Sequence, residues 1–189
     1  MKYDSEDWKN ICRTVSDLCF LIFPFIRKKA VRSALVSNLF ESAAETYFLK
    51  KGIPVRASKN DQEPDLFFID EQLSCEIKVT GVDDCVVNKP VIWLGGRYSK
   101  RNSDYIFITW NYKVTKTLFE NGTRQKMSFV VFKTEIGKDD WKELSNSKNY
   151  YGLGLKSTLF QDRKYHTLVG NFTNGKFLLD DFTENFIDA

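Results

Sequence analysis

Two stretches near the N-terminus repeat their apolar residues every three or four positions, which is the spacing of one helix face. One runs from about Ser5 to Phe20, and Pro24 interrupts it. The other runs from about Arg27 to Lys51, and Gly52 is the residue type that most often ends a helix. The apolar positions are Trp8, Ile11, Cys12, Val15, Leu18 and Cys19 in the first stretch, and Val31, Ala34, Leu35, Leu39, Ala43, Tyr47 and Phe48 in the second. Two amphipathic helices are therefore predicted.

Short apolar runs with polar breaks follow, and they predict β-strands. Ile53 to Ala57 is expected to be a short strand that leads into a polar loop, Ser58 to Glu63. Two further runs, Leu66 to Ile69 and Leu73 to Val79, lie on either side of Asp70-Glu71-Gln72. Because only this short polar segment separates them, the two strands are expected to form a hairpin.

More strands and one helix are expected in the second half of the chain. Tyr105 to Trp110 and Phe129 to Phe132 are apolar enough for buried strands. Asp139 to Leu144 is predicted to be a short capped helix. Tyr150 to Phe160 and Tyr165 to Leu179 predict a small C-terminal β region. The mixture of helices and strands indicates a protein of the α/β (α+β) class.

The second strand of the predicted hairpin carries the most informative side chains. Because side chains alternate along a strand, Glu76 and Lys78 point to one face and Ile77 to the other. Asp65, just before the first hairpin strand, joins them if the two strands pair in register. Two neighbouring carboxylates need a cation to offset their repulsion. Mg²⁺ suits such a site, because it keeps several waters and completes its shell with substrate phosphate.

Pro64-Asp65 and Glu76-Ile77-Lys78, separated by ten residues, resemble the PD-(D/E)XK motif of restriction endonucleases and of many repair and recombination nucleases. The resemblance implies a restriction-endonuclease-like core, which is a mixed central β-sheet flanked by helices. It also implies that Asp65, Glu76 and the Ile77 carbonyl bind Mg²⁺, for which Mn²⁺ can substitute. Lys78 would orient the attacking water and stabilise the charge that develops on the phosphate.

The family motif includes a further carboxylate on an upstream helix. Glu41, in the second predicted helix, is the residue that matches it, and it lies off the apolar stripe. The resemblance implies that Glu41 binds a second metal ion or holds a metal-bound water. Glu45 follows four residues later on the same helix face, so the sequence leaves both glutamates open for this role.

Length and composition fit one soluble domain. The chain has 189 residues, of which 42% are hydrophobic and 28% charged, and this suffices for one core. We expect one nuclease domain over residues 1–189, with a catalytic core at about 27–110 and recognition or dimerisation additions at 111–189. Four cysteines without a C-x-x-C pair and a lone histidine, His166, argue against a zinc site and favour a reduced, cytoplasmic protein. The apolar run Leu18 to Ile26 is too short to span a membrane.

A polar, basic segment after the motif is a candidate for contact with DNA. Its lysine and arginine side chains can bind phosphates, and its arginine and asparagine side chains can form paired hydrogen bonds to base edges. An exposed connector is the alternative interpretation. The candidate DNA-binding residues are Arg97, Tyr98, Lys100, Arg101 and Asn102. Gly95-Gly96 lacks the Lys-Ser/Thr ending of a nucleotide-binding loop, so no nucleotide cofactor is expected.

The resemblance to this nuclease family implies three alternative functions. The first is a type II restriction endonuclease, a homodimer that cuts a specific double-stranded DNA sequence and leaves 5′-phosphate and 3′-hydroxyl ends. About 110 residues follow Lys78, which is room for loops that read bases. A structure-specific repair or Holliday-junction nuclease is the nearest alternative. A non-catalytic DNA-binding module of the same fold is the third, although the intact Asp65, Glu76 and Lys78 argue against it.

Overall fold

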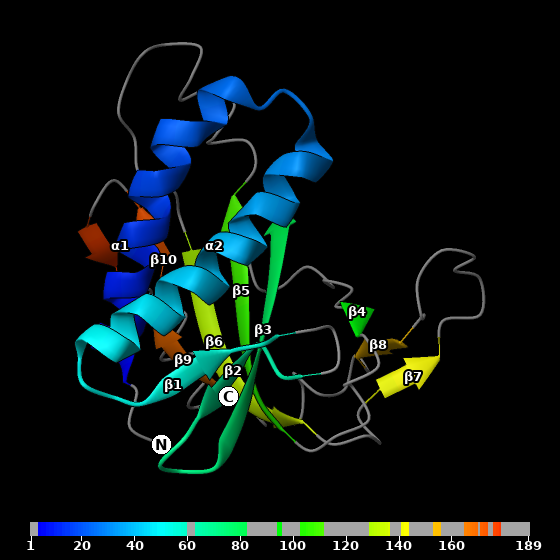
Figure 1. Cartoon of the computed structure of the whole chain (residues 1–189). Coiled ribbons are helices and arrows are strands. Elements are labelled where there is room, and N and C mark those ends of the chain that lie inside the picture. The colour runs from blue at the N-terminus through cyan, green and yellow to red at the C-terminus, as the bar shows by residue number, and fades with distance from the viewer. Residues whose placement is uncertain are drawn as a thin grey trace.

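Two helices and a mixed β-sheet form an α+β arrangement in the computed structural model (Figure 1). The structure describes residues 4–59, 63–82, 94–95, 103–111, 129–136, 141–143, 153–155, 165–169, 171–173 and 176–178 of the 189-residue chain. Within these ranges, no helix has both the length and the apolar character needed to cross a membrane. The observed class agrees with the α+β expectation from the sequence.

Helix α1, Ser5–Ile22, begins with a reciprocal cap. The Asp7 N–H donates to Asp4 Oδ1 and the Asp4 N–H donates to Asp7 Oδ2, both at 3.0 Å, so the first turn satisfies its own donors. The predicted apolar face is buried at Trp8, Ile11, Cys12, Val15 and Cys19. The 3₁₀ helix η1, Phe23–Phe25, follows at Pro24, where the sequence predicted the interruption.

Helix α2, Lys29–Lys50, ends where the sequence predicted. Gly52 has a φ of 79°, the left-handed conformation that glycine adopts at no steric cost. The Ile53 N–H donates to the Phe48 carbonyl at 2.9 Å and the Gly52 N–H donates to the Leu49 carbonyl at 3.0 Å. These two bonds form the glycine-based cap that satisfies the last carbonyls of a helix.

The predicted apolar stripe of α2 is partly wrong. Val31 and Ala34 are exposed, whereas Val36 and Phe40 are fully buried. The first half of the helix carries apolar residues on more than one face, so periodicity permits two overlapping stripes. Packing against α1 and the sheet selects the stripe that comprises Val36, Phe40, Ala43, Ala44 and Phe48.

Within the described part of the chain, the central sheet has six strands in the order β1-β2-β3-β5-β6-β9. β3 and β5 are parallel and the other neighbouring pairs are antiparallel, so the sheet is mixed. The predicted hairpin is confirmed as β2 and β3, and the predicted buried strands are β5 and β6 in the sheet interior. The bounds are β1 Val55–Ala57, β2 Leu66–Phe68, β3 Leu73–Val82, β5 Ser103–Asn111, β6 Phe129–Ile136 and β9 Tyr165–Val169.

The hydrophobic core lies between the helices and one face of this sheet. Cys75 and Ile77 of β3 join Ile106 and Ile108 of β5 in the same buried cluster as the apolar faces of α1 and α2. Figure 1 shows α2 running diagonally across the sheet, and the helix contacts both β1 and β3. Because side chains alternate, the residues between these core positions point to the opposite face of the sheet.

Two expectations for the second half of the chain need correction. Asp139 to Leu144 is not a helix where the structure describes it, because β7, Trp141–Glu143, pairs antiparallel with β8, Leu153–Leu155. Strand β8 also pairs with β4, Leu94–Gly95, so long-range pairing overrides the local helix signal. The C-terminal β region is confirmed as strands, but β9 belongs to the central sheet. Among the described residues, β10, Asn171–Thr173, and β11, Lys176–Leu178, form a separate hairpin, and β8 belongs to the small sheet with β4 and β7.

Candidate active site

The register of the β2–β3 hairpin brings the two motif halves together. Leu66 pairs with Cys75, so Asp65 lies one step before β2 and opposite Glu76. The Asp65 N–H donates to Glu76 Oε2 at 3.4 Å, and the Ile77 N–H donates to Asp65 Oδ2 at 2.7 Å. The first of these bonds is long and the second is short. The Asp65 carboxylate is therefore held against the backbone of β3 at the position of Ile77.

The backbone of Ile77 faces this carboxylate. In a strand, the N–H and the carbonyl of one residue point to the same side. Because the Ile77 N–H points at Asp65, the Ile77 carbonyl is directed toward the same edge. Three oxygen-bearing groups thus lie together where β2 begins beside β3. They are the predicted metal ligands, namely the carboxylates of Asp65 and Glu76 and the carbonyl of Ile77.

Lys78 lies beside these acids. Its Nζ donates to Glu76 Oε1 at 2.7 Å, so the two side chains lie on the same face of β3. The pair is largely shielded from water, because the Lys78 side chain is 20% exposed and the Glu76 side chain 6%. A buried ion pair of this kind contributes little net stability, since desolvation of both charges offsets their attraction. Its placement, rather than its contribution to folding, makes it a candidate for chemistry.

The structure separates the two helical glutamates. Glu45 Oε1 accepts a hydrogen bond of 2.7 Å from the Ala57 N–H, so it caps the outer edge of β1. Glu41 is half-buried and lies within electrostatic range of Glu76 and Lys78. A side-chain hydrogen bond from Ser37, one turn earlier on α2, also stabilises its charged form. Glu41 is thus the glutamate that the fold brings to the motif residues.

The charges at this corner do not balance among themselves. Burial first, and then the Glu76 carboxylate, raise the pKa of Asp65 to about 7, although Lys78 acts in the opposite direction. Burial also raises the pKa of Glu41, and Glu76 adds to this rise. Burial alone would lower the pKa of Lys78, but Glu76, Asp65 and Glu41 outweigh it, so this pKa lies above its ordinary value. Three carboxylates face one ammonium, and a further cation would relieve their repulsion.

The donor set fits a hard cation that keeps part of its water. Among the described residues, no three His, Cys, Asp or Glu side chains stand close enough to hold an ion by themselves. Two carboxylates and a carbonyl leave several coordination positions open, and Mg²⁺ accepts such a site because it retains waters. Burial first, and then the Glu76 carboxylate, disfavour a negative charge on Asp65, and a bound divalent ion would offset this cost.

Two aromatic residues next to the site were not expected to belong to it. In the parallel pairing of β3 with β5, Tyr105 lies beside Glu76 and Phe107 lies beside Lys78. Both rings are fully buried, and they stack with centroids 5.7 Å apart. They form an apolar side wall for the charged pair. The apolar run predicted a buried strand, but no local signal indicated that it would lie alongside the motif strand.

The candidate DNA-binding residues cannot be placed against this site. They lie outside the described residues. The residues concerned are Arg97, Tyr98, Lys100, Arg101 and Asn102. Their role in DNA contact therefore stays a prediction.

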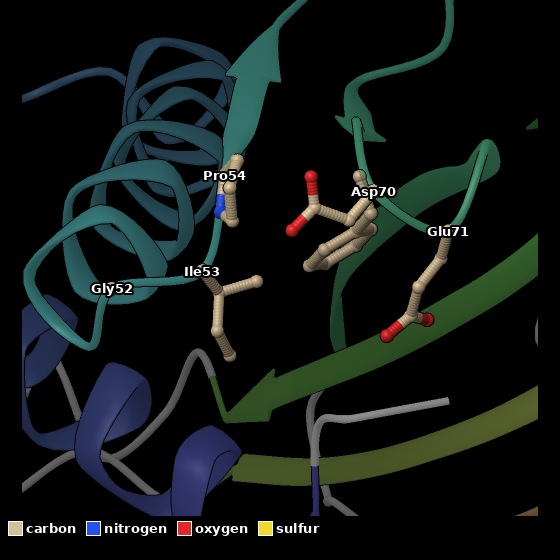
Figure 2. Close-up of a pocket in the computed structure, with 6 residues that line it drawn as sticks. Gly52, Ile53, Pro54, Asp70 and Glu71 are labelled. Atoms are coloured by element: carbon tan, nitrogen blue, oxygen red, sulfur yellow. The ribbon is translucent and has the colours of Figure 1, made fainter.

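A small pocket lies away from the motif residues. Figure 2 shows Asp70 and Glu71 of the hairpin turn across from Ile53 and Pro54. The pocket has a volume of about 50 Å³, which is room for little more than a few waters. None of the candidate catalytic residues lines it, so it is not the candidate active site.

No model of a protein family matches the chain, and no curated protein matches it either. The motif and the geometry of the corner formed by α2, β2 and β3 are therefore the features that bear on the function of the chain.

Proposed function

We propose that the protein is an Mg²⁺-dependent endonuclease that cuts double-stranded DNA, with a restriction-endonuclease-like core. The observation that carries the proposal is the convergence of Asp65, Glu76 and Lys78 at one shielded corner, where the Asp65 carboxylate accepts the Ile77 N–H and Lys78 pairs with Glu76. Pairs of acids beside a lysine, with a backbone carbonyl directed at them, suit phosphodiester hydrolysis. The mixed sheet and the helical Glu41 agree with this assignment.

Each residue has a role that follows from its chemistry. Asp65, Glu76 and the Ile77 carbonyl would hold Mg²⁺, and Glu41 would act through water. When bound, the ion supplies positive charge for the scissile phosphate and acidifies a water. Lys78, which the neighbouring carboxylates keep protonated despite its burial, would donate hydrogen bonds that position this water and stabilise charge on the phosphate. The stacked rings of Tyr105 and Phe107 keep the neighbouring face of β3 apolar.

The narrower assignment is a type II restriction enzyme. On this proposal, a homodimer cuts each strand of a symmetric site and leaves 5′-phosphate and 3′-hydroxyl ends, since two-fold symmetry matches a palindrome. The described residues contain no feature that favours a junction-specific or a non-catalytic function over this one.

The direct test is cleavage of a long duplex of known sequence. The purified protein is incubated with the duplex and Mg²⁺, with an EDTA control, and the ends of the products are sequenced. Discrete fragments whose ends share one sequence would support the restriction enzyme. Cuts restricted to branches or flaps would instead identify the protein as a repair-type nuclease. Binding without any metal-dependent cut would reject catalysis.

A further inference from the structure

An exposed apolar and basic surface lies at the turn between α1 and α2, at the upper end of Figure 1. We call residues 21–31 the α1–α2 turn. Phe25 is 85% exposed, Leu21 is 64% exposed and Val31 is 49% exposed. Arg27 and Lys28, between these apolar side chains, are exposed as well. Large exposed apolar side chains close to cations are typical of a binding surface rather than of a turn that only connects two helices.

The charge of this surface has a single sign. The sequence contains no acidic residue between Asp17 and Glu41, whereas it contains Arg27, Lys28, Lys29 and Arg32 there. Among the residues that the structure describes, no carboxylate pairs with Arg27 or Lys28. A second copy of the same surface would bring like charges together, which disfavours a dimer contact here. A polyanion is the partner whose charge is complementary.

The turn also has a defined shape. Arg32 Nε donates to the Ile26 carbonyl at 2.7 Å, and its guanidinium lies 5.4 Å from the centre of the Phe23 ring. The buried Phe23 in turn packs against Trp110 of β5, with ring centroids 5.9 Å apart. Arg32 is thus occupied in fixing the turn to the core, and Arg27 and Lys28 are the cations left for a partner.

Helix α2 connects this surface to the candidate active site. Glu41 lies thirteen positions after Lys28, and the helix between them spans roughly 20 Å at about 1.5 Å per residue. Along B-form DNA, roughly 20 Å corresponds to about six base pairs. A duplex that runs parallel to α2 with one phosphate near Glu41 would therefore place another phosphate within reach of the turn.

We propose that the α1–α2 turn is a second DNA contact, in which Arg27 and Lys28 bind backbone phosphates about six base pairs from the cut and Phe25 packs against the groove wall. This inference rests on the proposed nuclease function. Apolar side chains next to cations serve DNA in this way when they press against sugars or wedge between base steps. An anionic membrane has the same sign of charge, but it gives no reason for the fixed connection to Glu41.

The test compares an Arg27→Ala/Lys28→Ala double variant, Phe25→Ala and the wild type. Lys50→Ala is the matched control, because Lys50 is an exposed lysine at the other end of α2. Binding of a fluorescent duplex is measured by anisotropy in EDTA between about 50 and 200 mM salt, the range over which phosphate contacts weaken most visibly. Thermal melts of all variants verify that the fold is unchanged.

The double variant is expected to lower the slope of log affinity against log salt by about two, since each phosphate contact contributes about 0.9. Phe25→Ala is expected to weaken binding at an unchanged slope, and Lys50→Ala to leave both unchanged. An unaltered slope and affinity in the double variant would overturn the proposal. If the double variant loses binding to anionic vesicles but binds DNA as tightly as the wild type, the partner of the α1–α2 turn is a membrane and not DNA.

A parallel cleavage assay separates this inference from the proposed function. If the wild type cuts DNA with Mg²⁺ and the double variant binds DNA equally well, only the second contact is wrong. If the wild type neither binds nor cuts DNA, the nuclease proposal fails and the α1–α2 turn loses its assigned partner with it.

Discussion

The Asp65 carboxylate accepts a hydrogen bond from the Ile77 N–H at 2.7 Å, which connects the residue before β2 to the middle of the motif strand β3. This bond positions the first acid of the motif beside the second, Glu76, and beside Lys78. It forms only if the hairpin has the register observed, because a slip of one residue would turn Glu76 and Lys78 to the core face. The candidate site is thus a direct consequence of strand pairing.

Removal of the lysine is expected to separate catalysis from binding. Lys78→Ala should reduce the cleavage rate by about 10² to 10³-fold, the loss seen when one donor to a developing charge is deleted. Affinity for duplex DNA should change little, since one cation among many phosphate contacts is lost. Rates with saturating Mg²⁺ and anisotropy titrations measure the two quantities, with Lys50→Ala as the control. Retained cleavage would remove Lys78 from the mechanism.

The stability of the metal-free protein is expected to depend on Asp65 and pH. Its pKa is raised to about 7 from an ordinary value of 3.8, so the folded state binds more protons than the unfolded state between these values. The contribution of Asp65 to the free energy of unfolding therefore decreases as pH rises from about 4 to 7, and it is lost above pH 7. Asp65→Asn keeps an acceptor for the Ile77 N–H and removes the titration.

Denaturant unfolding in EDTA at pH 5, 6, 7 and 8 tests this expectation. The stability advantage of Asp65→Asn over the wild type should increase with pH and level off above about pH 7. Titrating groups that do not interact with Asp65 cancel in the difference, and Lys78, whose pKa lies above its ordinary value, does not titrate in this pH range. An advantage that is constant across the series would contradict a raised pKa for Asp65.

Substitutions of the two helical glutamates are expected to have different effects on stability and cleavage. Glu45→Ala removes the acceptor of the Ala57 N–H and should lower the free energy of unfolding by about 1 to 3 kcal/mol, because a part-buried donor loses its partner. Glu41→Ala removes a half-buried carboxylate near Glu76 and should reduce cleavage while leaving stability equal or higher. Denaturant unfolding and cleavage rates of the two variants provide the comparison. The reverse pattern would exchange their roles.

The polar segment after β4 is expected to contribute to sequence recognition. Arg97→Ala and Arg101→Ala should weaken DNA binding by about 1 to 3 kcal/mol where the guanidinium reads a base edge. In that case the loss is confined to one position of the recognised sequence, which competition with single-base variants of the site reveals. A uniform loss with a smaller salt slope would indicate phosphate contact instead. No effect on either measure would make the segment a connector.

Several local features followed from the sequence alone. The cap at Gly52, the apolar face of α1, the β2–β3 hairpin and the common face of Glu76 and Lys78 were all predictable. Each depends on backbone geometry within a few residues, namely the periods of helix and strand and the conformations open to glycine. Short-range rules therefore sufficed to predict that Glu76 and Lys78, two of the four candidate catalytic residues, are neighbours.

Other features were decided by contacts between segments far apart in the chain. Glu41 and Glu45 share one helix face, and only the packing of α2 on the sheet directs Glu45 to the edge of β1 and Glu41 toward Lys78. The addition of β9 to the central sheet and the strand at Trp141–Glu143 likewise came from long-range pairing. Periodicity states which residues share a face but not what that face meets, because the partner is chosen by the free energy of burying the whole fold.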